Sequence, residues 1–253
     1  MTGLDAVVVE RRGRVQIITM TRAAKRNAID SSITAGLDAA FNEFEDDPDL
    51  WCAVLTGGAE FFCAGADLAT GPGEPTPRGG IAGLIQRRRT KPLIAAVEGF
   101  ALGGGFELVL SCDLVVASRT ARFGLPEPKR GLVPDFGGAF RAARLLPANI
   151  AREMLLTARG LSAQRAENLG LVNELTEPGA ALDAAVALAE EICGNAPLAV
   201  REALAIVNQE IHGDETAAWA RSNAAHQRLL TSRDVSEGVG AFFEKRPPRW
   251  TGE

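Results

Sequence analysis

Two glycine-rich segments each carry a carboxylate and could place bare backbone N–H groups beside a ligand. Residues 62–68 read Phe-Cys-Ala-Gly-Ala-Asp-Leu, and residues 101–108 read Ala-Leu-Gly-Gly-Gly-Phe-Glu-Leu. Because glycine and alanine put little side chain in the way, a ligand can approach the backbone closely at such positions. Two N–H groups directed at one carbonyl oxygen would form an oxyanion hole, which stabilises negative charge developing on that oxygen.

Two glutamates are candidates for proton transfer next to this backbone. Glu107 closes the second segment, and Glu127 follows in Phe-Gly-Leu-Pro-Glu at residues 123–127. Two carboxyl groups beside one water can divide the roles of acid and base, because like charges that share a site push their pKa values apart. Glu107 is expected one turn into an apolar helix, where a charge is rarely kept without a partner or a role. Asp67 is expected to fix its own loop.

Composition describes a globular protein without an evident nucleic-acid or membrane partner. The chain has 253 residues, of which 46% are apolar, and a net charge of −5. This length allows one sizeable core, or a main domain with a smaller appendage, and the acidic balance disfavours nucleic acid. The longest apolar runs are too short to span a membrane, and residues 1–5 do not begin a secretory signal, which predicts a cytoplasmic location. The spacing of four cysteines and two histidines predicts no metal site, and His212 and His226 are interpreted as structural.

Hydrophobic patterning predicts alternating strands and helices up to about residue 117, followed by a helical part from about residue 137. The expected strands are a hairpin over residues 6–20 and buried strands at 51–56, 93–97 and 114–117. The expected helices run from Asp30 or Ser31 to Pro48, over a short stretch ending in the arginines at 87–89, and over 104–112. Residues 70–80 are expected to form a loop, and the basic run 87–91 a solvated helix end or, alternatively, an attraction for phosphates.

With these residues in hand, the chain resembles the crotonase (enoyl-CoA hydratase/isomerase) superfamily over nearly its whole length. The motifs occur in family order at residues 25–28, 64–67, 103–108, 112–113, 123–127, 131–134, 137–138 and 237–246. The resemblance implies an α/β fold, a crotonase-like spiral of ββα units over residues 1–195. It implies a C-terminal helical region over residues 196–253 that covers the active site and forms a homotrimer or a dimer of trimers.

The resemblance also implies an acyl-CoA thioester as substrate, with no separate cofactor because CoA is part of the substrate. Carried over by motif, the oxyanion donors are the N–H groups of Ala66 and Gly104, and the catalytic carboxylates are Glu107 and Glu127. The residues implied along the substrate and CoA path are Lys25, Ala28, Ala64, Asp67, Leu68, Gly103, Phe242 and Lys245. Asp135 stands where some isomerase relatives carry an acid that transfers protons, and a turn-capping role is the alternative.

The intact glutamate pair favours syn addition of water to a 2-enoyl-CoA thioester through an enolate. In this interpretation Glu127 protonates C2, while Glu107 orients and deprotonates the water. Residues 105–108, 125–127, 133–135 and 244–250 resemble carnitinyl-CoA dehydratases, which hydrate crotonobetainyl-CoA, and this is the first alternative. The second is a Δ3,Δ2-enoyl-CoA isomerase that uses Asp135 or one glutamate. A non-catalytic acyl-CoA-binding or RNA-binding member is a third, against which the glutamate pair and the acidic net charge count.

Overall fold

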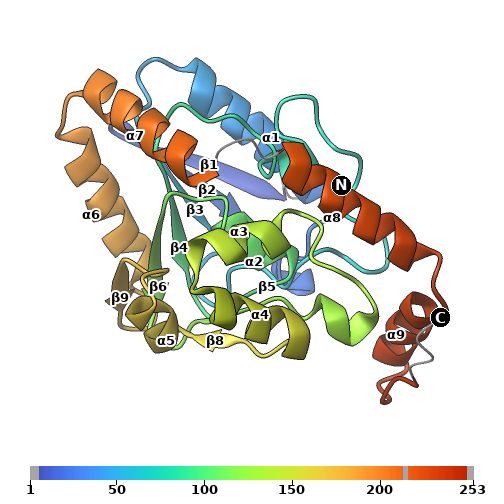
Figure 1. The fold of residues 1–253 in the computed structure, drawn as a ribbon. Helices are drawn as coiled ribbons and strands as arrows, with labels where there is room; N and C mark the ends of the chain where they lie inside the picture. The colour runs from blue at the N-terminus through green and yellow to red at the C-terminus, as the bar shows by residue number, and fades with distance from the viewer. Residues whose placement is uncertain (1–5, 213–215, 250–253) are drawn as a thin grey trace, which may run out of the picture.

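A computed structural model describes residues 6–212 and 216–249, and the chain folds around two sheets (Figure 1). Residues 1–5 and Trp250, which the sequence interpretation used, lie outside the described residues. The larger sheet contains, in spatial order, β1 (Val7–Arg12), β2 (Val15–Met20), β3 (Cys52–Thr56), β4 (Leu93–Val97), β6 (Leu114–Ser118) and β9 (Glu174–Thr176). The smaller sheet contains β5 (Phe100–Leu102), β7 (Arg122–Gly124) and β8 (Leu161–Ser162).

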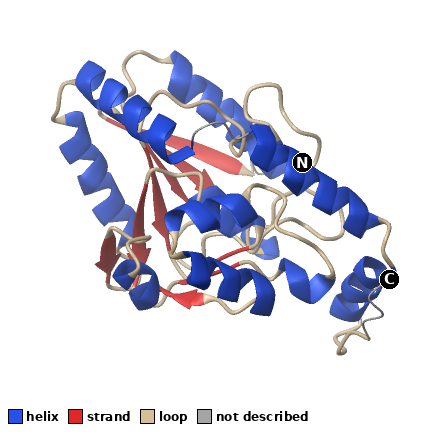
Figure 2. Cartoon of the chain, in the orientation of Figure 1, coloured by secondary structure: helices blue, strands red, loops and turns tan. Residues whose placement is uncertain are grey.

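The helices cover both faces of the larger sheet and extend beyond it at the C-terminal end (Figure 2). The described α-helices are α1 (Ser31–Asp46), α2 (Gly104–Val109), α3 (Gly138–Leu145), α4 (Ala148–Thr157), α5 (Ala163–Asn168), α6 (Ala181–Cys193), α7 (Pro197–His212), α8 (Thr216–Leu230) and α9 (Arg233–Phe243). Three short 3-10 helices are η1 (Ala23–Lys25), η2 (Ile81–Gly83) and η3 (Glu127–Arg130). Among the described residues, no helix is long and apolar enough to cross a bilayer.

Two apolar layers follow from the alternation of side chains along the strands. Val54 and Ile94 belong to a cluster with Ala185 of α6, whereas Leu55 and Ala95 belong to the larger cluster on the opposite face. Since successive strand residues point to opposite faces, a strand covered on both sides must be apolar throughout. β3 and β4 are buried at every position, as expected of parallel strands between two helical layers.

Most elements expected from the sequence are present. β1 and β2 form the antiparallel hairpin, and β2, β3, β4 and β6 pair in parallel. Asp30 caps α1 by accepting hydrogen bonds from the backbone N–H groups of Ser32 and Ile33. The smaller sheet was not expected, because its strands are only two or three residues long and carry no periodic pattern.

The helix expected to end in the arginines at 87–89 is wrong. Residues 81–83 form a single 3-10 turn, in which Ala82 and Gly83 have positive φ, and residues 87–89 are irregular. The side chains of Arg87 and Arg89 turn inward to Asp38 (2.5 Å) and Asp113 (2.6 Å) rather than toward solvent. The glycines around this turn end the helical pattern that the apolar residues suggested.

Candidate active site

The two glycine-rich segments lie side by side and exchange backbone contacts. Cys63 pairs with Ala101 in an isolated parallel bridge, and the N–H of Leu102 donates to the carbonyl of Cys63 at 3.0 Å. Gly65 has a φ of 104°, and a Cβ there would lie 2.9 Å from the carbonyl oxygen of Leu102 and 3.4 Å from the nitrogen of Gly104. Only glycine fits this approach, which brings the backbone of residue 66 next to the start of α2.

Both expected oxyanion donors are left without partners by this pairing. The N–H of Ile29 donates to Gly65, and the N–H of Asp67 donates to Ile29, each at 2.8 Å, so the bridge passes over Ala66. Gly104 is the first residue of α2, and the helix uses no N–H at that position. None of the hydrogen bonds found among the described residues uses the N–H of Ala66 or Gly104. Two adjacent free donors are what an oxyanion hole requires.

Glu107 is buried at the base of the same site. Its side chain points from α2 toward α3, where Oε1 accepts a 2.7 Å hydrogen bond from the backbone N–H of Gly138. Burial raises the pKa of Glu107 well above its ordinary value, and the negative charges of Glu127 and Asp135 add to the rise. A carboxyl group in this setting is suited to hold a proton at neutral pH.

Glu127 faces the same space from η3. Its Oε2 is buried and has no hydrogen-bond partner among the described residues. Burial raises the pKa of Glu127 to about 7, and the charge of Asp135 acts in the same direction. A Cβ at Gly103 would lie only 2.8 Å from Oε1 of Glu127. This close contact explains why a glycine precedes Gly104, the second oxyanion donor. A carboxyl group that has a pKa near 7 and an oxygen without a hydrogen-bond partner is a candidate acid or base.

One cavity of about 390 Å³ collects these groups. Of the residues expected at the site, its lining includes Lys25, Ala28, Ala64, Ala66, Asp67, Leu68, Gly103, Gly104, Glu107, Glu127, Asp135 and Phe242. Lys245 does not line it, and Phe242 reaches the cavity of its own chain. The cavity is large enough for part of a small-molecule ligand and combines apolar walls with a few polar groups.

Asp67 has a structural contact of its own. Its Oδ2 accepts a 2.8 Å hydrogen bond from Arg22 in an ion pair, and its Oδ1 accepts one from the N–H of Ala69. Although burial acts the other way, the hydrogen bond from Arg22 holds the pKa of Asp67 below its ordinary value. Asp67 therefore fixes the loop that carries Ala66, as the sequence suggested.

His226 and Arg130 are among the cavity residues that were not expected there. His226, interpreted from sequence as structural, lines the cavity with its Nδ1 3.1 Å from Oδ2 of Asp135. Arg130 lines it as well, and its guanidinium carbon lies 4.6 Å from the ring centroid of Phe242. Helical patterning showed that His226 lies on a helix but not which face meets the site. A lone arginine after Pro-Lys likewise gave no signal.

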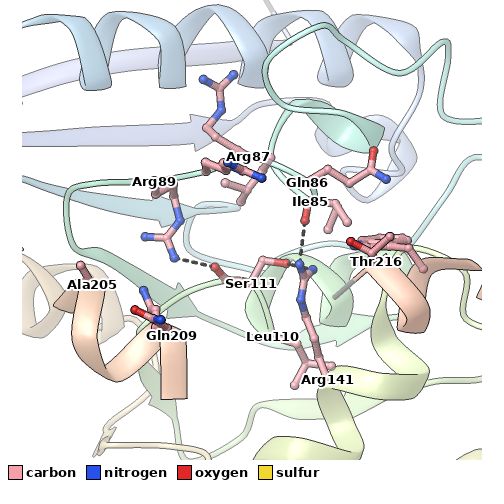
Figure 3. Close-up of a pocket in the computed structure, with 14 residues that line it drawn as sticks. Ile85, Gln86, Arg87, Arg89, Leu110, Ser111, Arg141, Ala205, Gln209 and Thr216 are labelled. Carbon is pink, nitrogen blue, oxygen red and sulfur yellow. Dashed lines mark hydrogen bonds between the residues drawn. The ribbon is translucent and has the colours of Figure 1, made fainter. Parts of the chain in front are cut away.

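The three arginines at 87–89 line a different cavity, of about 760 Å³, between the 84–89 segment, the end of α2 and α7 (Figure 3). Arg89 and Arg141 both bind Ser111, Arg89 through the serine carbonyl (2.9 Å) and Arg141 through the hydroxyl (2.8 Å). The hydroxyl of Ser111 in turn donates to the carbonyl of Glu107. Arg89 and Arg141 thus hold the C-terminal end of α2 in place through Ser111. The expectation that residues 87–91 form a solvated helix end is therefore wrong.

No metal centre emerges from the side chains of residues 6–212 and 216–249. In those ranges, no group of three or more His, Cys, Asp or Glu side chains is arranged to hold an ion. The four cysteines are free, with Cys52 and Cys63 buried. Burial raises the pKa of Cys63 to about 12, so this thiol stays protonated.

Comparison with known proteins agrees with this geometry. The family model described as enoyl-CoA hydratase/isomerase matches residues 10–253. The chain belongs to the enoyl-CoA hydratase/isomerase family. It is 41% identical to a carnitinyl-CoA dehydratase of Salmonella paratyphi A over 98% of this chain and 99% of the relative.

Solved structures of family members share the fold along the whole chain. A carnitinyl-CoA hydratase from Mycobacterium avium is 42% identical, with a TM-score of 0.94 over 99% of this chain and 100% of the relative. An enoyl-CoA hydratase from Mycobacterium tuberculosis H37Rv is 45% identical, with a TM-score of 0.80 and the same coverage. The crotonase-like α/β architecture expected from the sequence is thus confirmed.

Proposed function

We propose that this family member adds water across the 2,3 double bond of a 2-enoyl-CoA thioester. The observation that carries the proposal is the meeting of two unpartnered N–H groups, of Ala66 and Gly104, with two buried glutamates in one cavity. When water adds to C3, the thioester oxygen gains negative charge as an enolate forms. Loss of one oxyanion donor costs enzymes about 3–4 kcal/mol of transition-state stabilisation, so two preorganised donors would strongly favour this step.

The proton balance of the reaction suits a glutamate pair that holds one proton. The ionised carboxylate takes a proton from water as the water oxygen bonds to C3, and the protonated carboxyl group gives its proton to C2. The pair therefore begins and ends with one proton. The sequence assigned the donor role to Glu127, but the deeper burial of Glu107 favours the proton there in the substrate-free protein. The hydrogen bond from Gly138 acts in the opposite sense, toward an ionised Glu107.

The acyl-CoA would enter along the residues that connect the cavity to the surface. Lys25 is exposed on η1, and Ala28, Ala64 and Leu68 offer small or apolar walls beside it. A lysine at the mouth of an otherwise apolar path suits the phosphates of CoA. Lys245 lies outside this lining, so its contact with CoA stays a prediction.

A second candidate is hydration of crotonobetainyl-CoA, the reaction that the similarity to carnitinyl-CoA dehydratases favours. The alignment at 41% identity spans 98% of this chain and 99% of the relative. Asp135 supplies a carboxylate near the glutamates, and its negative charge would attract a quaternary ammonium group.

The deciding experiment assays the purified protein with crotonyl-CoA, crotonobetainyl-CoA and a 3-enoyl-CoA side by side. Hydration of crotonyl-CoA with the highest kcat/KM supports the main proposal, and preference for crotonobetainyl-CoA supports the second. Conversion of only the 3-enoyl-CoA contradicts both. Butyryl-CoA, which has no double bond to hydrate, serves as the binding control. Binding of every acyl-CoA without turnover would show that the protein is a non-catalytic acyl-CoA-binding member of the family.

We infer that the protein assembles into homotrimers or dimers of trimers through its C-terminal helices. Support comes from α7, where Leu198, Ile206 and Val207 have 72%, 63% and 50% of their surface exposed, with no covering element among the described residues. Apolar side chains grouped on one helix commonly mark an interface between copies. The division into a core over 1–195 and an assembly region over 196–253 belongs to this proposal.

A further inference from the structure

Asp135 and His226 meet inside the catalytic cavity from distant parts of the chain. Oδ2 of Asp135 lies 3.1 Å from Nδ1 of His226, and the two side chains are 24% and 27% exposed. Both belong to the cavity lining, together with Glu107 and Glu127. The pair is therefore partly open to a bound substrate and close to the groups that move protons.

Helix α8, which carries His226, contacts residues 135–140 at two points. Trp219 and His226 are seven residues apart on α8, so they share one face of the helix. The ring of Trp219 meets that of Phe140 with centroids 5.2 Å apart, while His226 reaches Asp135. Both contacts fall on residues 135–140, on either side of Gly138, whose N–H holds Glu107. α8 thus presents His226 at a defined place.

The charges around Asp135 determine what this pair can do. Asp135 faces Glu107 from α2, Glu127 from η3 and His226 from α8, and Arg130 also faces Glu127. Burial raises the pKa of Asp135, whereas His226 acts to lower it and so favours the ionised carboxylate. A negative Asp135 in turn raises the pKa of both glutamates. The other charged groups around the cavity are Arg141, which opposes the rise at Glu107, and Lys25, Arg26 and Asp67 at its lining.

We propose that Asp135 and His226 are positioning residues, in which His226 keeps Asp135 ionised and that charge keeps one proton on the Glu107–Glu127 pair at neutral pH. This role rests on the proposed function, because the addition of water needs one protonated and one ionised member of the pair. Without the charge of Asp135, the pair loses its remaining proton at lower pH and has no acid for C2. Neither residue needs to touch the reacting atoms.

The test follows the protonated carboxyl band of the pair by infrared difference spectroscopy of the substrate-free protein between pH 5 and 9. The band is assigned by its loss in a Glu107→Gln/Glu127→Gln double variant. In Asp135→Asn, which keeps the shape but not the charge, the midpoint should fall by about one pH unit, a tenfold change in proton affinity. Asp135→Glu, which keeps the charge, should stay near the wild-type midpoint. An unchanged midpoint in Asp135→Asn overturns the proposal.

The role of His226 is tested by the same infrared titration of the Glu107–Glu127 pair, carried out in the wild-type protein and in Asp135→Asn. His226→Gln should lower the midpoint in the wild-type protein and leave it unchanged in Asp135→Asn, because the histidine acts through Asp135. An equal shift in both backgrounds, or none in either, overturns this part. If Asp135→Asn proves poorly folded, Asp135→Ser replaces it as the uncharged background in this comparison.

Kinetics separate this proposal from the proposed function. In Asp135→Asn, the alkaline limb of the kcat profile for crotonyl-CoA hydration should move to lower pH by the same amount as the infrared midpoint, with KM changed less than about threefold. If the alkaline limb of the kcat profile does not move with the infrared midpoint, Asp135 and His226 do not control the proton used in catalysis. If the wild-type protein hydrates no enoyl-CoA, the proposed function fails, while the infrared titration still decides whether Asp135 and His226 control the proton.

Discussion

The backbone N–H of Gly138 donates a 2.7 Å hydrogen bond to Oε1 of Glu107 and so joins the start of α3 to the side chain of α2. No side chain could replace this glycine without contact, since a Cβ there would lie 2.7 Å from Oε1 and 2.8 Å from Cγ of Glu107. The bond orients a buried carboxyl group whose pKa is already raised by burial and neighbouring charge. Its geometry is therefore central to the proposed chemistry.

Gly138→Ala should reduce kcat for enoyl-CoA hydration by about 100-fold, because a displacement of the order of 1 Å at a catalytic group costs roughly this much. The matched control is Gly240→Ala on α9, where a Cβ meets no atom within 4 Å. The control should keep full activity and gain slightly in stability, by about 0.5–1 kcal/mol. Equal kcat in both variants would show that the position of Glu107 is not limiting. Steady-state kinetics and urea unfolding supply the two measurements.

Replacing either glutamate by glutamine should remove proton transfer while keeping the shape of the cavity. Glu107→Gln and Glu127→Gln should each lower kcat by about 100-fold to 10,000-fold, the usual range for loss of a general acid or base. Acyl-CoA binding, measured by calorimetry with butyryl-CoA, should change little. The variant that loses the alkaline limb of the pH profile identifies the donor to C2. Full hydration activity in either variant would contradict the mechanism.

Stability should depend on pH through Glu127. The pKa of this carboxyl is about 7 in the folded protein, against an ordinary value of 4.5. The folded state therefore holds a proton that the unfolded state releases, so its contribution to stability is complete below pH 4.5 and is lost as the pH rises through 7. The loss at pH 8 can reach about 3 kcal/mol, at 1.36 kcal/mol per pKa unit.

Glu127→Gln should accordingly be more stable than the wild-type protein at pH 8 but not at pH 4.5. Urea unfolding at one protein concentration measures both differences. Glu177→Gln, at a side chain 79% exposed, serves as the control and should show no such gain. Equal stability of Glu127→Gln and wild type at pH 8 would mean that the carboxyl is ionised at little cost.

Assembly should depend on the exposed apolar residues of α7. Ile206→Glu should convert the oligomer to monomers, because a carboxylate in an apolar interface has no partner to replace water. Leu156→Glu on α4 is the control, since Leu156 is 79% exposed and stands apart from α7. Light scattering after size-exclusion chromatography measures the mass of each. An intact oligomer for Ile206→Glu would place the interface elsewhere.

Local patterns in the sequence were enough for five strands of the larger sheet, all but β9, and for the backbone of the site. Apolar runs at 52–56 and 93–97 indicated buried strands, since a strand covered on both faces must be apolar at every position. Glycines at 65 and 103 marked close backbone approaches, because glycine alone accepts a positive φ there at no cost. The family motifs placed Glu107 and Glu127 together, and the cavity contains both.

Contacts between distant segments were decided only by the tertiary structure. The pairing of Arg87 with Asp38 and of Arg89 with Asp113 turned an expected solvated helix end into a buried brace. His226 reached Asp135 because α8 turns one particular face toward the cavity, and helical periodicity does not say which neighbour a face meets. Local patterning thus predicted the long buried strands and the oxyanion backbone, whereas burial and long-range charge, which set the protonation of the glutamates, exist only in the folded chain.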